Sequence, residues 1–396
     1  MDRENKIKKV FSDLKKYISE NKIFTVPVTV CICIGIVSVI VWKLSIKFVF
    51  IADFFTGTIS FALRFILTAA TYYIPFSLAE FMLFSCAPLF IYIGFRLVAA
   101  KKKWTALLKF LSRALAVFGI FMFIFTFTFG VCYGKTPVNQ KINFERRLLS
   151  SEDLAGAMEI LIGETNKATE NIKYIYADTG STKMPYGLNE MNQKLNEAYI
   201  NMLKKHDLFR RIRARVKPVI LSAEMSKMHI TGIYAPFTGE ANINIDFPDY
   251  NLPYTAAHEM SHLMGVARED EANFTAFLVC LYSKDSYIRY SGLVNMTEYI
   301  GNALYGADKE RYYEIMGRMP EIVLYEMTAY AKFFDKYRDT RISKVASAVN
   351  DTYLKAQGQE QGEKSYGFVV DLAAVYLLDV YDKIDKIDKI DKIIID

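Results

Sequence analysis

Cysteine is scarce in this sequence. Of its 396 residues only five are cysteines, and four of them lie within or at the end of strongly apolar stretches, which leaves Cys280 in the polar part. A single thiol there cannot form an internal disulfide. The sequence therefore excludes a disulfide-stapled module, and it contains no redox motif.

Charged residues are also few, and they are unevenly placed. They make up 23% of the chain against 52% hydrophobic residues, which argues against a disordered or fibrous protein. Residues 1–135 hold 17 Lys and Arg against 6 Asp and Glu, whereas residues 136–396 hold 32 against 37. The basic excess belongs to the apolar third of the chain, so it indicates membrane topology rather than nucleic-acid binding. No glycine-rich phosphate loop is present, which disfavours a nucleotide enzyme.

Long uncharged stretches predict a transmembrane domain in residues 1–134. Ile23–Trp42 and Ala114–Tyr133 are each 20 residues long, which is enough to cross a hydrocarbon core of about 30 Å. Seven Lys and Arg precede the first stretch and no small-residue cleavage site follows it, so it is typical of an uncleaved anchor. We expect spans at about residues 23–42, 80–100 and 112–133.

One further apolar stretch, residues 48–73, contains Asp53 and Arg64. Because charges inside a span are costly, we expect this stretch to be interfacial or re-entrant. The basic N-terminus and the cluster Lys101–Lys103 should both face the cytoplasm, and three spans satisfy this while four do not. The N-terminus is then cytoplasmic, and everything after about Gly134 lies outside the cytoplasmic membrane.

Residues 135–380 are expected to form a second domain of class α+β. Helical periodicity covers Phe144–Glu170, Asn189–Val216 and most of residues 253–378. Short alternating or β-branched runs predict strands at residues 219–221, 230–234 and 241–245. Because the strands give way to helices, the pattern favours a mostly helical domain with a small antiparallel sheet. Residues 381–396 repeat Asp-Lys-Ile and are expected to be a low-complexity tail.

Histidine is even rarer than cysteine, with four in the chain, yet two of them fall in one motif, His258-Glu259-Met260-Ser261-His262. Helix signals surround this H-E-x-x-H, with Pro253 near the expected first turn and Gly265 after the last. Residues i and i+4 share a helix face, so both imidazoles can bind one metal ion while Glu259 projects beside it. The other two histidines, His206 and His229, lack such spacing and are expected in the surface or core.

A catalytic zinc site generally needs a third protein ligand and an open fourth position. The acidic run Glu269-Asp270-Glu271 follows the motif and opens a new helix. Glu269 shares its helix face with Ala272, Asn273 and Ala276, small residues that suit packing against the first helix. Glu269 is therefore the first candidate, with Glu271 second and Asp270 third.

These residues resemble the gluzincin branch of zinc metallopeptidases, in which some members carry E-x-x-A-N or E-x-x-A-D on the second helix. The resemblance implies that Glu269 binds zinc (Zn2+) and that Asn273 orients a histidine. More closely, the chain is similar to a bacterial family of multi-span membrane proteins known only as a domain of unknown function. The similar stretches are residues 75–77, 232–242, 258–274, 350–355 and 365–367.

The resemblance implies a zincin-like fold and a membrane-anchored peptidase that hydrolyses peptide bonds with metal-activated water. Glu259 would be the general base, and Tyr234 or Tyr366 would stabilise the oxyanion. Residues 241–245 occupy the place of the strand that pairs with extended peptide in zincins. The expected partners are the lipid bilayer and a peptide or protein, with no nucleic acid or nucleotide. The alternatives are a non-catalytic zinc-binding sensor or scaffold and, less favoured, an intramembrane protease.

Overall fold

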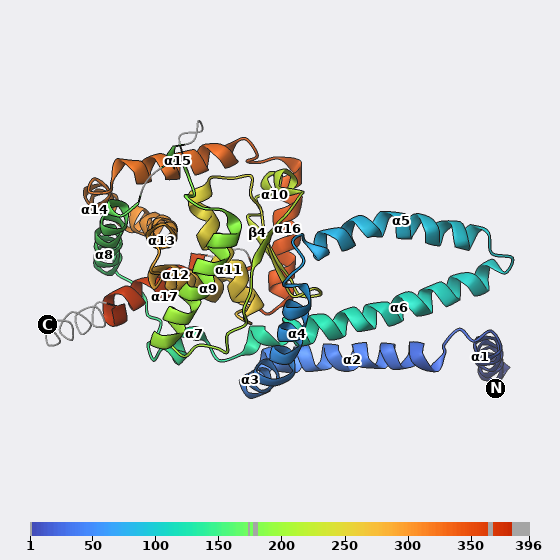
Figure 1. The fold of residues 1–396 in the computed structure, drawn as a ribbon. Coiled ribbons are helices and arrows are strands. Elements are labelled where there is room, and N and C mark those ends of the chain that lie inside the picture. Colours follow the sequence, from blue (N-terminus) through green and yellow to red (C-terminus); the bar gives the residue numbers. More distant parts are fainter. Residues whose placement is uncertain (1, 173–174, 177–180, 363–366, 382–396) are drawn as a thin grey trace.

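The computed structural model describes residues 2–172, 175–176, 181–362 and 367–381, and it is mostly helical. Figure 1 shows long N-terminal helices that extend from one side of a larger helical body. The N-terminal elements are α1 (Asp2–Glu20), α2 (Val26–Lys47), α3 (Val49–Phe55), the π-helical turn η1 (Thr56–Ser60), α4 (Phe61–Thr71), α5 (Leu78–Val98), α6 (Lys103–Thr128) and the 3-10 turn η2 (Gly130–Gly134).

Four of these stretches are long and apolar enough to cross a membrane, by length and composition: Val26–Lys47, Val49–Thr71, Leu78–Val98 and Lys103–Gly134. Three of them coincide with the spans expected from the sequence. The fourth, Val49–Thr71, is the stretch expected to be interfacial or re-entrant. In Figure 1 it runs across the ends of α2 and α6, next to the helical body, whereas α2, α5 and α6 point away from that body.

The helices α2 and α6 approach each other closely because glycines meet at their crossing. A Cβ atom on Gly35 would lie 2.5 Å from the Cα of Gly119, and a Cβ on Gly119 would lie 2.3 Å from the carbonyl oxygen of Cys31. Small residues at such a crossing let the two backbones come into contact, which is a common way for membrane helices to associate. These two helices therefore form the best-packed pair in the apolar part.

The helical body surrounds a small sheet. Its elements are α7 (Val138–Lys141), α8 (Ser151–Glu170), β1 (Ile175–Tyr176), β2 (Thr182–Lys183), α9 (Leu188–Lys205), β3 (Val216–Pro218), α10 (Ser222–Lys227), β4 (Gly232–Ala235), β5 (Glu240–Ile243), η3 (Asp249–Asn251), α11 (Leu252–Leu263), α12 (Glu269–Leu281), α13 (Ser286–Ala307), α14 (Lys309–Met316), α15 (Glu321–Asp335), α16 (Arg341–Ala356), α17 (Val369–Tyr376) and the π-helical turn η5 (Leu377–Tyr381).

The three-stranded sheet has the order β3-β5-β4, and it is mixed. β4 pairs with β5 antiparallel, but β3 pairs with β5 parallel, so the expectation of an antiparallel sheet is wrong. The chain leaves β3 through α10 and β4 before it returns as β5, and this long crossover lets β5 run alongside β3 in the same direction. β5 is therefore the central strand and β4 is an edge strand.

Several element boundaries also differ from the sequence pattern. The helix expected from Phe144 starts at Ser151, where Ser150 and Asp153 form a capping box. The helix expected to reach Val216 ends at Lys205, and residues 216–218 instead form β3, upstream of the expected strand at 219–221. The expected tail from residue 382 onward lies outside the described residues.

The core of the body is built on α11 and α12, which lie in its centre (Figure 1). Every residue of α12 is buried, including the three acidic residues of its first turn. Buried carboxylates require hydrogen bonds or charged partners. The partners of these three carboxylates define the site described next.

Candidate metal centre

The histidine motif lies on α11, as the sequence predicts. Pro253 occupies the first turn, where a missing N–H costs nothing, and the helix continues to Leu263. Gly265 then adopts a φ of +89°, a left-handed conformation that turns the chain toward α12. The rings of His258 and His262 lie one turn apart on the same face, with their centroids separated by 4.6 Å. Both rings therefore face the start of α12.

Glu269, the first residue of α12, meets both histidines. Its Oε2 lies 3.2 Å from Nε2 of His258 and 3.3 Å from Nε2 of His262. One potential ligand atom from each of the three residues lies within 4.8 Å of the others. His262 and Glu269 are buried and His258 is nearly so. This His/His/Glu group could hold a metal ion.

The geometry of the three residues fits such an ion. Two ligand atoms that are each about 2.1 Å from a tetrahedral zinc ion are about 3.4 Å apart, close to the two distances observed here. Nδ1 of His262 donates a hydrogen bond to the carbonyl oxygen of Val266 at 2.7 Å, which orients the ring so that Nε2 is directed at the carboxylate. Apart from these two ring nitrogens, Glu269 Oε2 has no polar partner among the described residues. A cation between the three atoms would satisfy it.

The charges at the site favour a cation. Burial by itself raises the pKa of Glu269, but the two neighbouring histidines outweigh it and lower this pKa to about 2. Burial likewise lowers the pKa of His262, but the Glu269 carboxylate outweighs that effect and raises it to about 9. Carboxylate and imidazole thus stabilise each other's charged forms, as expected for a pocket with an excess of negative charge.

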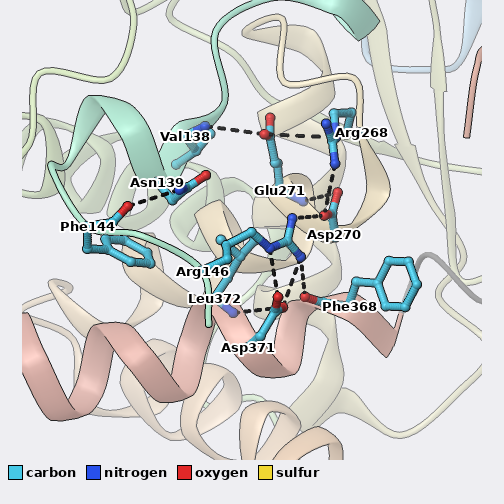
Figure 2. A network of polar contacts seen from close by, with 10 residues as sticks. All are labelled: Val138, Asn139, Phe144, Arg146, Arg268, Asp270, Glu271, Phe368, Asp371 and Leu372. Atoms are coloured by element: carbon cyan, nitrogen blue, oxygen red, sulfur yellow. Dashed lines mark hydrogen bonds and ion pairs between the residues drawn. The ribbon is translucent and has the colours of Figure 1, made fainter. Parts of the chain in front are cut away.

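The other two acids of α12 point into a separate polar network, shown in Figure 2. Asp270 accepts a hydrogen bond from Nη1 of Arg146 at 2.7 Å, and Glu271 accepts one from the backbone N–H of Val138 at 3.2 Å. Arg146 continues to Asp371, with Nε 2.8 Å from that carboxylate. Asp270 and Glu271 therefore anchor the start of α12 to α7 and α17, and Glu269 is the acid that reaches the histidines.

Glu259, the expected general base, projects toward β4. The backbone N–H of Tyr234 hydrogen-bonds to its carboxylate, and its Oε2 is buried with no hydrogen-bond partner among the described residues. Gly232 makes room for this side chain, because a Cβ there would lie 2.6 Å from Oε1 of Glu259. Burial raises the pKa of Glu259, and this effect is opposed by the two histidines. A buried carboxylate with a raised pKa beside a potential metal site is suited to proton transfer.

Asn273 lies one turn after Glu269, and among the described residues no hydrogen bond joins its side chain to a histidine. The hydroxyl of Tyr254 donates to its side-chain oxygen at 3.3 Å, and the Tyr299 hydroxyl also interacts with its side chain. Nδ1 of His258 is buried with no partner among the described residues. That Asn273 orients a histidine stays a prediction.

Of the two tyrosines expected to stabilise the oxyanion, the structure describes Tyr234. Tyr366 lies outside the described residues. The Tyr234 ring packs against Phe129, with centroids 5.2 Å apart, and its hydroxyl is buried without a hydrogen-bond partner in the described part. Its catalytic role stays a prediction. A further tyrosine, Tyr353 of α16, was not among the residues expected from the sequence. Its hydroxyl accepts a hydrogen bond from the Tyr133 hydroxyl at 3.2 Å.

The charge of Glu269 affects the pKa of Tyr353. Burial raises its pKa, and the Glu269 carboxylate adds to that effect. Tyr353 belongs to the stretch 350–355 that carries the family resemblance, and this was the signal that could have identified it. It is a third tyrosine to consider beside the reacting groups.

The N-terminal helices also contribute to the site. Phe129, just after α6, packs its ring edge-to-face on His262 at 5.5 Å. Arg64 of α4 is 2% exposed, and its Nη1 donates to the carbonyl oxygen of Leu263, the last residue of α11, at 3.1 Å. A cation at the C-terminal end of a helix is stabilised by the helix dipole. Sequence reasoning missed both contacts, although a charge inside an apolar helix is a sign of such a role.

Comparison with known proteins identifies a family but no activity. Residues 55–374 match the family described as "Protein of unknown function (DUF3810)". This match covers most of the chain, and the chain belongs to that family. It confirms the resemblance to a family known only as a domain of unknown function. No curated protein and no solved structure was found to match the chain.

Proposed function

We propose that this member of the family is a membrane-anchored zinc peptidase with Glu259 as general base. The observation that carries the proposal is the meeting of His258, His262 and Glu269 in one buried group, with the Glu259 carboxylate beside it. Structural metal sites need no general base, so a buried carboxylate with an unpartnered oxygen favours catalysis.

The donor set favours zinc among the common metal ions. Two imidazole nitrogens and one carboxylate oxygen are the ligands found in peptidase zinc sites, whereas magnesium and calcium prefer oxygen ligands alone. Three protein ligands also leave a coordination position for water or substrate, as catalytic zinc sites require. When bound, the ion would acidify a water molecule and polarise the carbonyl of the substrate.

Residues of the chain would carry out proton transfer, orient a histidine and stabilise the oxyanion. Glu259 is positioned by the Tyr234 N–H, and Oε2 is free to accept a proton from the attacking water and return it to the leaving amine. Asn273 and one of the three tyrosines, Tyr234, Tyr353 or Tyr366, would complete the site by orienting a histidine and stabilising the oxyanion.

The edge strand β4 offers a place for a peptide backbone. Residues 241–245 were expected to provide this strand, but β5 is paired on both sides and cannot do so. Because the Asn244 N–H donates to the Thr231 carbonyl, alternation along the ladder turns the polar backbone groups of Gly232 and Tyr234 away from β5. The Tyr234 N–H already bonds the Glu259 carboxylate, so an extended peptide could pair with the remaining outward groups of this edge, next to Glu259.

For the membrane we propose three spans, α2, α5 and α6, with Val49–Thr71 lying in the outer interface. Trp42 and Lys43 near the end of α2 are typical of a membrane surface, and they contact the helical body through Gln357 and Ala356. The basic N-terminus and residues 101–103 then face the cytoplasm. In intact cells, Lys355→Cys should react with an impermeant thiol reagent and Lys102→Cys only after lysis. The opposite pattern would invert this topology.

Metal content of the purified full-length protein is the first test of the site. Wild type should hold one zinc per chain, and Glu269→Gln should lose it because one of three ligands is gone. Glu271→Gln is the matched control, since the same charge is removed two residues away in a side chain that faces Val138. Zinc loss in Glu271→Gln with full zinc in Glu269→Gln would refute the assignment of the ligands.

Hydrolysis is tested with a mixed peptide library and the zinc-loaded protein in lipid nanodiscs. Glu259→Gln should keep its zinc and lose cleavage by at least about a hundredfold, because general-base catalysis of this kind contributes about that much or more. An equally active Glu259→Gln would remove Glu259 as the base. A wild type with full zinc that cleaves no peptide would favour the non-catalytic zinc-binding sensor or scaffold.

A further inference from the structure

A cavity of about 390 Å³ lies between α13, α15 and the turn before β4. It is lined by His229, Glu298, Tyr330, Ala331, Phe334 and Arg338. These residues come from α13, from α15 and the turn after it, and from the turn before β4. The segments are far apart in the sequence, so the cavity is a product of the fold.

The chain itself shows how close this cavity is to the reacting groups. His229 precedes Gly232, the residue that makes room for Glu259, by three residues, a span of at most about 10 Å. Glu298 precedes Tyr299, whose hydroxyl interacts with Asn273 and whose pKa is raised by burial and further by the Glu298 and Glu269 carboxylates. Two of the residues that line the cavity are thus close in the sequence to residues that contact the candidate site.

Glu298 gives the cavity its charge. It is largely buried, and no hydrogen bond or ion pair to it is found among the described residues. Burial alone raises its pKa to about 7. The cation at the cavity, Arg338, is already neutralised, because its Nη2 lies 2.6 Å from Asp335 and its side chain is 71% exposed. The interior is thus acidic while the rim is neutral.

Aromatic rings form the walls around this carboxylate. Tyr330 and Phe334 pack against each other at 4.8 Å, and the His229 ring lies on Phe334 at 5.3 Å. An acid in the lining of an aromatic-lined cavity is an arrangement that can bind an ammonium or guanidinium group, through a charge-assisted hydrogen bond and cation–π contacts. A neutral apolar group would leave the carboxylate buried without a partner.

We propose that this cavity binds a cationic group of the substrate and that Glu298 is the residue that recognises it. The inference rests on the proposed peptidase function, because it treats the cavity as a subsite of the same cleft. The cation is either the side chain of a lysine or arginine, or the amino group of an N-terminal residue. Both sources share the chemistry that Glu298 recognises.

Binding of small probes to zinc-loaded, full-length protein in nanodiscs tests this inference without any need for hydrolysis. Nα-acetyl-lysine amide presents only the side-chain ammonium, norleucine amide presents only the α-ammonium, and Nα-acetyl-norleucine amide is neutral. Titration followed by saturation-transfer NMR should show that one of the two cationic probes binds at least about tenfold more tightly than the neutral one. The probe that binds identifies the source of the cation.

Glu298→Gln should abolish that preference, bringing the cationic probe to the affinity of the neutral one, while the zinc content and unfolding temperature stay at wild-type values. Glu310→Gln, which removes the same charge from an exposed position on α14, is the matched control and should change nothing. Equal binding of all three probes to wild type, or an unchanged preference in Glu298→Gln, would overturn the proposal.

The two proposals fail in different ways. If the cationic probe binds through Glu298 but wild type with full zinc cleaves no peptide, the role as a substrate subsite is refuted together with the peptidase. If wild type cleaves peptides but shows no Glu298-dependent binding of either cation, the peptidase stands and the cavity assignment falls.

Discussion

Two apolar helical stretches of nearly equal length behave in opposite ways in this protein. Val49–Thr71 and Leu78–Val98 both have the length and composition of a membrane span. In the first, Arg64 is buried against Leu263 and Thr68 donates to the carbonyl oxygen of Gly239. In the second, the most apolar part of the helix has no residue buried within the protein. Polar residues inside an apolar helix therefore persist where the rest of the chain supplies their partners.

Among the described residues, the hydrogen bonds that join the second stretch, α5, to the helical body all come from the first turn of α5. The Glu80 carboxylate accepts the backbone N–H groups of Ile220 and Leu221, and Glu240 accepts those of Leu78 and Ala79. Beyond this turn most of its side chains are apolar and exposed, so that lipid is the natural surrounding. Substitutions along the two stretches should thus have unequal effects.

The largest effect is expected at Arg64. Arg64→Met removes the donor to the Leu263 carbonyl and leaves that buried oxygen without a partner, which should lower the free energy of unfolding by about 2–4 kcal/mol. Zinc affinity should also fall by about tenfold or more, because Leu263 follows His262 directly. Denaturant titration and a zinc competition assay measure the two quantities.

The matched control is Arg96→Met on α5. Arg96 donates to the Tyr92 hydroxyl in an exposed position, so its loss should change the free energy of unfolding by less than about 0.5 kcal/mol. Equal effects of the two substitutions would contradict the comparison of the two stretches.

A third cation, Lys135, tests how much the burial of a charge costs where fewer partners compensate for the lost solvation. It follows the turn η2 directly and is 5% exposed. Burial lowers its pKa from 10.5 to about 8, although Glu271 opposes the shift. The unfolded chain binds this proton more tightly than the folded one between these values, so stability should rise with pH from about 8 to about 10.5, by up to about 3 kcal/mol.

Lys135→Met should flatten that rise and raise the stability at pH 7. Denaturant titrations at several pH values between 7 and 10 measure both effects. A wild type whose stability stays constant over this range would show that Lys135 is neither desolvated nor shifted in pKa.

A smaller loss is expected at Asp53. Its carboxylate accepts hydrogen bonds from the backbone N–H of Thr136 at 2.9 Å and from the Thr136 hydroxyl at 2.6 Å. Asp53→Asn removes the charge from both bonds and should cost about 1–2 kcal/mol of unfolding free energy. Ser85→Ala on α5 is the comparison, because Ser85 donates to Phe81 of its own helix and its loss should cost almost nothing. An Asn variant as stable as wild type would remove this anchor.

Sequence patterns predicted the parts of this molecule that depend on neighbouring residues. Three of the four candidate spans follow from apolar runs, and the histidine motif places its two rings on one face of α11. The choice of Glu269 over Glu271 followed from helix periodicity alone, and the structure brings Glu269 to both histidines.

The features that escaped prediction join distant segments. The parallel pairing of β3 depends on a crossover through α10 and β4, which no local pattern encodes. Arg64 meets Leu263 across 199 residues, and Phe129 reaches His262 from the end of α6. The only sequence signal for these contacts is the charge of Arg64 inside an apolar helix, which predicts that the side chain has a partner but does not identify it.

The smallest expected difference is one of depth, and it decides whether Val49–Thr71 crosses the membrane. Phe50, Ile59 and Ile66 are exposed along this stretch, and Phe90 is exposed near the middle of α5. Nitroxide labels at these positions report depth through their relative accessibility to oxygen and to a water-soluble nickel complex. For an interfacial helix the first three labels should lie at nearly the same shallow depth, whereas the label at Phe90 should lie up to about 15 Å deeper, near the bilayer centre. A spanning helix would instead separate Phe50 from Ile66 by about 24 Å along the membrane normal and place Ile59 as deep as Phe90. That second pattern would make Val49–Thr71 a fourth span and place the metal centre on the same side as the N-terminus, with residues 101–103 on the opposite side.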